Sequence, residues 1–159
     1  MATGPWVDPT ELDFDHVAVP EDRLRRHLPQ RHEFQLLDRV CLVDVERKLL
    51  VGYKDLTPED WWARGHFPGR PLFPGVLMLE GAAHAATVLW REHSGIEDDT
   101  LIGFGGVEHV RYRGQVVPPG RIVFVSQGGM FRRRIARMPT QALYEGQVVF
   151  EAEILGVTL

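Results

Sequence analysis

One segment, residues 76–91, constrains the fold more than any other part of the chain. It is apolar on nearly every face, which is typical of a helix buried in a protein core. Its small residues indicate that another element packs very close to it: Gly81, Ala82, Ala83, Ala85 and Ala86. Pro74 and Gly75 precede the segment as a start signal, so we expect a buried helix over residues 75–91.

The chain on both sides of this helix has the patterns of β-strands. Before it, residues 36–46 and 48–56 read as two strands joined by a tight turn. After it, we expect strands near residues 101–104, 107–113, 121–127, 132–138 and 142–155. This order predicts an α+β fold in which a sheet wraps around one central helix.

Length and composition describe one globular domain that needs no metal or disulfide for its stability. The 159 residues are 44% apolar and 25% charged, and a chain of this length buries roughly 70% of its unfolded surface. The single cysteine, Cys41, excludes an internal disulfide framework and a cysteine zinc cluster. The net charge of −4 argues against general nucleic-acid binding. No apolar run approaches the ~20 residues that span a bilayer.

The first residues differ in composition from the rest. Residues 1–22 hold six acidic side chains and no lysine or arginine, and three prolines interrupt residues 1–27. We therefore divide the chain into an extended acidic arm, residues 1–27, and a domain, residues 28–159, with one helical turn at residues 21–27. The N-terminus lacks a basic region followed by an apolar stretch, so we expect no secretory signal and a cytoplasmic protein.

A rigid loop precedes the buried helix. Thr57, Pro58 and Asp60 have the order of a helix start. Residues 65–75 then carry three prolines and three glycines. Prolines fix φ and glycines permit turns that other residues avoid, so we expect one specific loop shape around His66.

Two ionisable side chains differ from the other polar residues of the chain. Glu80 lies in the apolar helix, where glutamate is rarely buried without a reason. His84 follows one turn later on the same helical face. Four other histidines fall in polar surroundings and are expected at the surface: His16, His27, His32 and His93.

The run GHFPGRPLFPGVLMLE, from Gly65 to Glu80, resembles the signature of the 3-hydroxyacyl-(acyl-carrier-protein) dehydratases. It is similar to the Z-type enzymes, which have Glu where the A-type enzymes have Asp. Shorter matches at residues 28–31, 37–40, 110–113 and 116–118 extend the resemblance over about residues 28–156.

The resemblance implies a hotdog fold, with an antiparallel sheet wrapped around one long central helix. It implies a substrate carried as a thioester on acyl carrier protein, and no cofactor. It also implies a homodimer in which the His and the Glu of one site come from different subunits, with an acyl tunnel at their interface. The resemblance also allows further assembly of these dimers into a hexamer, as a trimer of dimers.

The residues of the run suit the dehydration of a 3-hydroxyacyl thioester. A neutral imidazole such as His66 can take the proton from C2 near neutral pH. Burial of Glu80 is expected to raise its pKa, so that the protonated carboxyl can protonate the departing C3 hydroxyl. Free N–H groups at the helix start, Gly75, can stabilise the thioester oxygen.

Two departures from the family pattern bear on substrate choice and activity. His84 stands where the family has Gln, and we expect a neutral His84 that hydrogen-bonds Glu80 and tunes the acid. Residues 32–34 read His-Glu-Phe where the family has Tyr-Pro-Phe. Together with the acidic arm, these changes indicate a divergent member.

Clustered arginines allow two interpretations: Arg111, Arg113, Arg132, Arg133 and Arg134. Such residues usually form a solvated face. The alternative is a landing surface for the acidic carrier protein.

Other functions are open at this point. A hotdog thioesterase would hydrolyse acyl thioesters through a helix carboxylate, and a non-catalytic protein would only bind acyl thioesters or keep the His66–Glu80 pair for packing. The enoyl-CoA hydratase branch of the fold has Asp five residues before the His, where this chain has Trp61. A metal held by His66, Glu80 and His84 is disfavoured, since nothing else in the sequence completes a zinc set.

Overall fold

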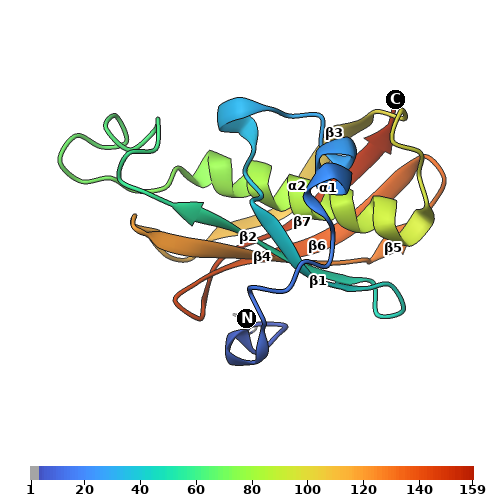
Figure 1. The fold of residues 1–159 in the computed structure, drawn as a ribbon, viewed down its shortest axis with the longest axis horizontal. Helices are drawn as coiled ribbons and strands as arrows, with labels where there is room; N and C mark the ends of the chain where they lie inside the picture. Colours follow the sequence, from blue (N-terminus) through green and yellow to red (C-terminus); the bar gives the residue numbers. More distant parts are fainter. Residues whose placement is uncertain (1–3) are drawn as a thin grey trace.

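A computed structural model describes residues 4–159, in which one long helix lies along one side of an antiparallel sheet (Figure 1). The helix is α2 (Gly75–Ser94), and the sheet order is β1-β2-β4-β6-β7-β3, with β5 paired to β6. The strands are β1 (Arg39–Asp44), β2 (Leu49–Leu56), β3 (Ile102–Tyr112), β4 (Gly120–Gln127), β5 (Met130–Phe131), β6 (Ile135–Tyr144) and β7 (Gln147–Thr158). The shorter helices are η1 (Pro9–Glu11), α1 (Glu21–His27) and η2 (His32–Phe34). This arrangement confirms the predicted α+β hotdog fold.

The sequence around α2 sets both its ends and its close packing. Pro74 precedes the first turn, and Gly95, in the left-handed region at φ 60°, ends the helix. The close approach that the small residues predict is observed at Gly81, where a Cβ would lie 2.3 Å from Cζ of Phe124. The helix therefore packs directly on β4, and Leu89 and Trp90 are fully buried in the core.

The opposite face of the sheet carries a second apolar cluster, because successive side chains of a strand point to opposite faces. It consists of Cys41, Leu49, Val51, Tyr53, Val123, Val125 and Leu143. Trp6, Val7, Leu12 and Phe14 from the N-terminal arm pack against it. Figure 1 shows the first part of the arm (dark blue), before α1, on the side of the sheet away from α2. Residues 6–14 of the arm thus cover an apolar face of the domain.

Three sequence predictions of local structure are wrong. Residues 57–64 form turns rather than a helix, although the Thr57 N–H does donate to Asp60 Oδ2 at 2.9 Å. The strand expected over residues 142–155 is broken by a hairpin turn at Glu145 and Gly146, both at positive φ. The strands expected at residues 101–104 and 107–113 form one strand, β3, with two register shifts against β7.

His27 is buried, not exposed as its polar neighbours predict. Its Nδ1 lies 2.8 Å from Asp98 Oδ1 and its Nε2 lies 2.7 Å from Glu92 Oε1. Arg91, also buried, donates to the carbonyl oxygens of His27, Glu97 and Thr100. This network fixes α1 on the last turn of α2.

None of the helices within residues 4–159 is long and apolar enough to cross a membrane. The first three residues, on which the prediction about a secretory signal partly depends, lie outside the described residues.

Candidate active site

His66 is held in one orientation by the loop that precedes α2. Its Nδ1 lies 2.8 Å from the Leu72 carbonyl oxygen, which can only accept, so the neutral ring carries its proton on Nδ1. The backbone of the loop is closed by the Leu72 N–H, which donates to the His66 carbonyl at 2.7 Å. A further bond from the Phe73 N–H to the Val116 carbonyl ties the loop to the segment before β4. The unprotonated Nε2 of His66 is therefore the atom that can act as a base.

Gly75 is the first residue of α2 and lies against Tyr112, the last residue of β3. A Cβ at this position would lie 2.8 Å from Cε1 of Tyr112, so only glycine fits without moving the ring. The side chain of the N-cap residue, Pro74, makes no hydrogen bond to the first turn of the helix. The first N–H groups of the helix have no partners within it and carry the positive end of the helix dipole. An oxygen with developing negative charge can be stabilised at this point.

Glu80 and His84 form a hydrogen-bonded pair on successive turns of α2. His84 Nε2 lies 3.0 Å from Glu80 Oε1, and the side chains are 2% and 34% exposed respectively. The hydrogen bond from His84 lowers the pKa of Glu80, and this effect outweighs burial, which alone would raise it. The expectation of a raised pKa for Glu80 is therefore wrong in this chain, because His84 stabilises the ionised carboxylate.

A narrow cavity of about 60 Å³ adjoins Glu80 between α2 and the sheet. Ala83 and Thr87 line it from the same helix, and Ile102, Gly103 and Phe104 line it from β3. The remaining lining residues are Gln30, His84, Met138, Ile154, Leu155 and Gly156. Among the described residues that line this cavity, which mix polar and apolar side chains, Glu80 is the one carboxylate.

Within one chain, the described contacts do not join His66 to Glu80. Gly75 contacts Tyr112 at one end of β3, whereas the Glu80 cavity reaches residues 102–104 at the other end. His66 does not line that cavity. Within the chain, His66 with Gly75 and Glu80 with its cavity are therefore two separate groups, near opposite ends of β3.

The arginines also separate into two groups. Arg111 and Arg113 lie at the Tyr112 end of β3, where Arg113 pairs with Glu151. The exposed Arg132, Arg133 and Arg134 follow β5. They lie near the other end of β3, because the Arg134 carbonyl accepts a hydrogen bond from the Thr158 N–H, and Thr158 pairs with Ile102 at the start of β3. Arg133 and Arg134 line a groove of about 470 Å³ there.

The three residues of the disfavoured metal site, His66, Glu80 and His84, are not brought together by the described contacts. Within residues 4–159, the side chains close enough to share an ion are Glu108, His109 and Glu153, which lie on the surface. Such acidic surface groups are common without a metal, so this group supports no metal chemistry.

One residue at the site escaped the sequence analysis. Gln30 lines the Glu80 cavity, and its Oε1 is buried without a hydrogen-bond partner among the described residues. Gln30 lies in the short family match at residues 28–31, but only its position in the folded chain places it at the site.

The sheet, the single long helix and the His-bearing loop at the helix start define a hotdog protein of the dehydratase type. The FabA-like domain family matches residues 28–153, and the chain belongs to this family. The family assignment made from the loop motif is therefore confirmed.

Relatives are similar over most of the chain. The sequence is 34% identical over 135 residues to the 3-hydroxyacyl-(acyl-carrier-protein) dehydratase FabZ of Saccharophagus degradans. The aligned region covers 84% of this chain and 92% of that relative. It is 36% identical over 129 residues to FabZ of Cronobacter sakazakii, which covers 80% of this chain and 85% of the relative.

Solved structures share the fold at much lower identity. The dehydratase heterocomplex ApeI:P of Xenorhabdus doucetiae matches with a TM-score of 0.70 at 16% identity, over 86% of this chain and 90% of that one. A mutant of the thioesterase PA1618 of Pseudomonas aeruginosa matches with a TM-score of 0.66 at 14% identity, over 89% and 96%. At these identities the likeness supports the hotdog fold alone.

Proposed function

We propose that this protein dehydrates (3R)-3-hydroxyacyl thioesters carried on acyl carrier protein to trans-2-enoyl thioesters, in fatty-acid or related lipid biosynthesis. The FabZ relatives, at 34% and 36% identity, support the reaction and the carrier. The observation that carries the proposal is the fixed His66 ring, whose Nδ1 is occupied by the Leu72 carbonyl while Nε2 is free to take a proton. We expect the protein in the cytoplasm.

In this mechanism the three site residues have different roles. His66 Nε2 removes the proton from C2. The N–H groups at the start of α2, next to Gly75, stabilise the negative charge on the thioester oxygen. Glu80 passes a proton to the C3 hydroxyl, which leaves as water while the C2–C3 double bond forms.

The separation of these two groups, His66 with Gly75 and Glu80 with its cavity, supports a homodimer formed through β3. This strand is at the edge of the sheet, and its exposed apolar side chains include Phe104 and Tyr112, each about half exposed. Antiparallel pairing of two β3 edges would bring the Tyr112 end of one protomer to the residue 102–104 end of its partner. His66 and Gly75 of one subunit would then complete the site of Glu80 on the other. The resemblance to the family extends this proposal to a trimer of dimers.

The same pairing supports a carrier-protein surface made from both subunits. Arg111 and Arg113 of one protomer would lie at the same end of the joined sheet as Arg133 and Arg134 of its partner. An acidic carrier protein that docks there would meet positive charge from both chains.

A thioesterase is the second candidate function, and one observation favours it. The hydrogen bond from His84 lowers the pKa of Glu80, so the carboxylate is ionised near neutral pH. An ionised helix carboxylate suits the activation of water for hydrolysis better than it suits proton donation.

One assay separates the candidate functions. The purified protein is incubated with 3-hydroxyacyl thioesters on carrier protein and on coenzyme A, and enoyl absorbance and free thiol are measured together. Enoyl product without thiol supports the dehydratase, and thiol release without enoyl product supports the thioesterase. Binding without either product would overturn both and leave an acyl-thioester binding protein.

A further inference from the structure

We propose that the acid of this site is a proton relay, in which His84 supplies the proton that Glu80 delivers. His84 then takes a new proton from solvent through a second cavity, which Gln30 borders. The proposal rests on the proposed dehydration and adds a route by which the acid regains its proton. His84 and Gln30 act through Glu80 and are positioning residues.

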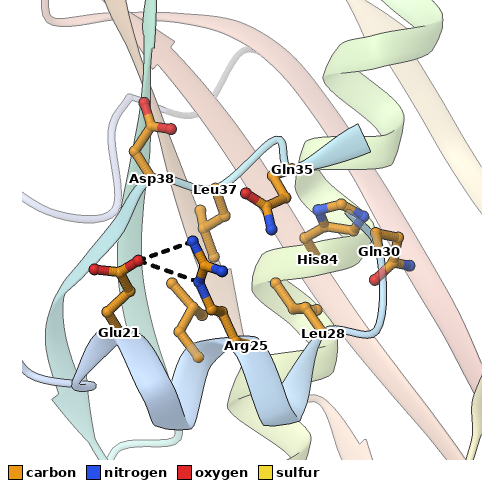
Figure 2. A pocket seen from close by; sticks show the side chains of 9 residues that line it. Glu21, Arg25, Leu28, Gln30, Gln35, Leu37, Asp38 and His84 are labelled. Carbon is orange, nitrogen blue, oxygen red and sulfur yellow. Dashed lines mark hydrogen bonds and ion pairs between the residues drawn. The ribbon is translucent and has the colours of Figure 1, made fainter. Parts of the chain in front are cut away.

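His84 lies between two cavities. On one side is the narrow cavity that holds Glu80. On the other is a cavity of about 260 Å³ bordered by α1, by residues 28–38 and by α2 (Figure 2). Figure 2 shows the His84 ring beside Gln30 and Gln35, with the ion-paired Glu21 and Arg25 elsewhere on the lining. His84 and Gln30 line both cavities, so they form part of the partition.

Two buried polar atoms at this partition have no partner among the described residues: His84 Nδ1 and Gln30 Oε1. The other ring nitrogen, Nε2, is bonded to Glu80. Leaving buried polar atoms unpaired is costly, and a polar cavity large enough for water is the usual remedy. A water bonded to Gln30 Oε1 could give a proton to His84 Nδ1.

Few charged groups face this imidazole. From α2, Glu80 is bonded to it, and the Glu80 cavity has no other titratable lining residue. From α1, Glu21 and Arg25 line the second cavity and pair with each other. Asp38, before β1, lines the same cavity and pairs with Lys54. Glu80 is therefore the carboxylate that a proton on His84 reaches.

The relay resolves a difficulty in the proposed mechanism. Glu80 is an acid that must donate a proton in every turnover, but its pKa is lowered by His84, so it does not hold that proton at rest near neutral pH. In the resting pair, Nε2–H of His84 donates to the ionised carboxylate. A proton taken up at Nδ1 makes the ring an imidazolium, and its Nε2 proton then passes to Glu80.

The protons balance over one turnover. The C2–H bond breaks and His66 takes the proton, while the electron pair forms the C2–C3 double bond. The C3–O bond breaks, and the oxygen takes the proton from Glu80 and leaves as water. One proton enters through His84 and the one on His66 returns to solvent, so the net products are the enoyl thioester and water.

The kinetic test replaces Gln30 by Met, which keeps the length of the side chain but removes the oxygen. We expect kcat of Gln30→Met to fall by about tenfold, below the 10²–10⁴-fold of a complete acid–base group, with KM unchanged and a larger solvent isotope effect. The matched control is Gln35→Met, which lines the same cavity without a buried unpaired atom and should match the wild type. An unchanged kcat in a folded Gln30→Met protein would overturn the relay.

A second measurement does not depend on activity. In ¹⁵N NMR of the imidazole side chains near neutral pH, His84 should be the Nε2–H tautomer. Its ring proton should exchange rapidly with solvent, because a second proton can enter at Nδ1, and the exchange should be slower in Gln30→Met. This result would support the proton route even if the assay above found no dehydration. A ring proton that is protected from exchange in the wild type, or that exchanges equally fast in Gln30→Met, would overturn it.

Discussion

His84 Nε2 lies 3.0 Å from Glu80 Oε1, one helical turn along α2, and the ring is almost completely buried while the carboxylate is partly exposed. The hydrogen bond from His84 stabilises the ionised form of the Glu80 carboxylate and lowers its pKa. The acid of the proposed site therefore depends on both residues of the pair, whereas the base is His66 alone.

Replacing His66 by Ala should abolish both dehydration and the exchange of the C2 proton with solvent, because His66 Nε2 is the proposed base. The expected loss is about 10²–10⁴-fold. C2 exchange is measured by deuterium incorporation into the substrate. Retention of rapid exchange in the variant would show that another group is the base.

Replacing Glu80 by Gln should leave substrate binding nearly intact and lower kcat by about 10²–10⁴-fold. The amide keeps the shape, and its oxygen can still accept from His84 Nε2, but it has no proton to pass on. Binding is measured by titration with a non-hydrolysable thioester analogue. If dehydration survives this change, Glu80 is not the acid, and the thioesterase and binding functions must be tested again.

Replacing His84 by Gln should reduce the loss of unfolding free energy that occurs as the pH falls into the acidic range. In the wild type the folded pKa of Glu80 is below its unfolded value of about 4.3, so the stabilisation is complete above that pH and is lost as pH falls through the folded pKa. Without the imidazole, the pKa of Glu80 should rise and this loss should shrink. Urea unfolding from about pH 6 to about pH 3 measures it. Parallel pH curves for the two proteins would contradict this explanation.

Reversing the charge of Arg111 or Arg133 to Glu should raise KM for carrier-bound substrate at low salt and leave KM for the coenzyme A thioester unchanged. Electrostatic steering weakens as the Debye length shrinks to about 8 Å near physiological ionic strength, so the difference from the wild type should fade with salt. Arg47→Glu, at the exposed turn between β1 and β2, is the control with the same change of net charge. Equal behaviour of all three variants would mean that these arginines are only solvated.

Replacing Gly81 by Ala should destabilise the fold by about 1–3 kcal/mol, the usual cost of overpacking a core. The added Cβ would lie 2.3 Å from Cζ of Phe124, an aromatic ring that is itself fully buried. Thermal unfolding measures the change. Gly65→Ala, where the nearest atom is 4.0 Å away, is the control. Equal stability of the two variants would show that Phe124 can move aside.

The helix and the catalytic loop could be predicted because their signals are local. The apolar faces and small residues of residues 76–91 require burial, and the prolines and glycines of residues 65–75 restrict the backbone wherever the chain folds. Strand ends were predicted less well, since the turn at Glu145 and Gly146 is contained within an uninterrupted alternating pattern. The helix expected at Thr57 failed because its capping bond closes a turn and the following residues continue as turns.

By itself, the sequence determined the central helix, the His66 loop, the presence of Glu80 and the family. These depend on periodicity, backbone restriction and a continuous motif. Only the tertiary structure decided that residues 6–14 cover the outer face of the sheet, that His27 is buried between Glu92 and Asp98, and that His84 lowers the pKa of Glu80. The burial of a polar group and the sign of a pKa shift depend on which atoms surround the group, and folding brings those atoms together from distant parts of the chain.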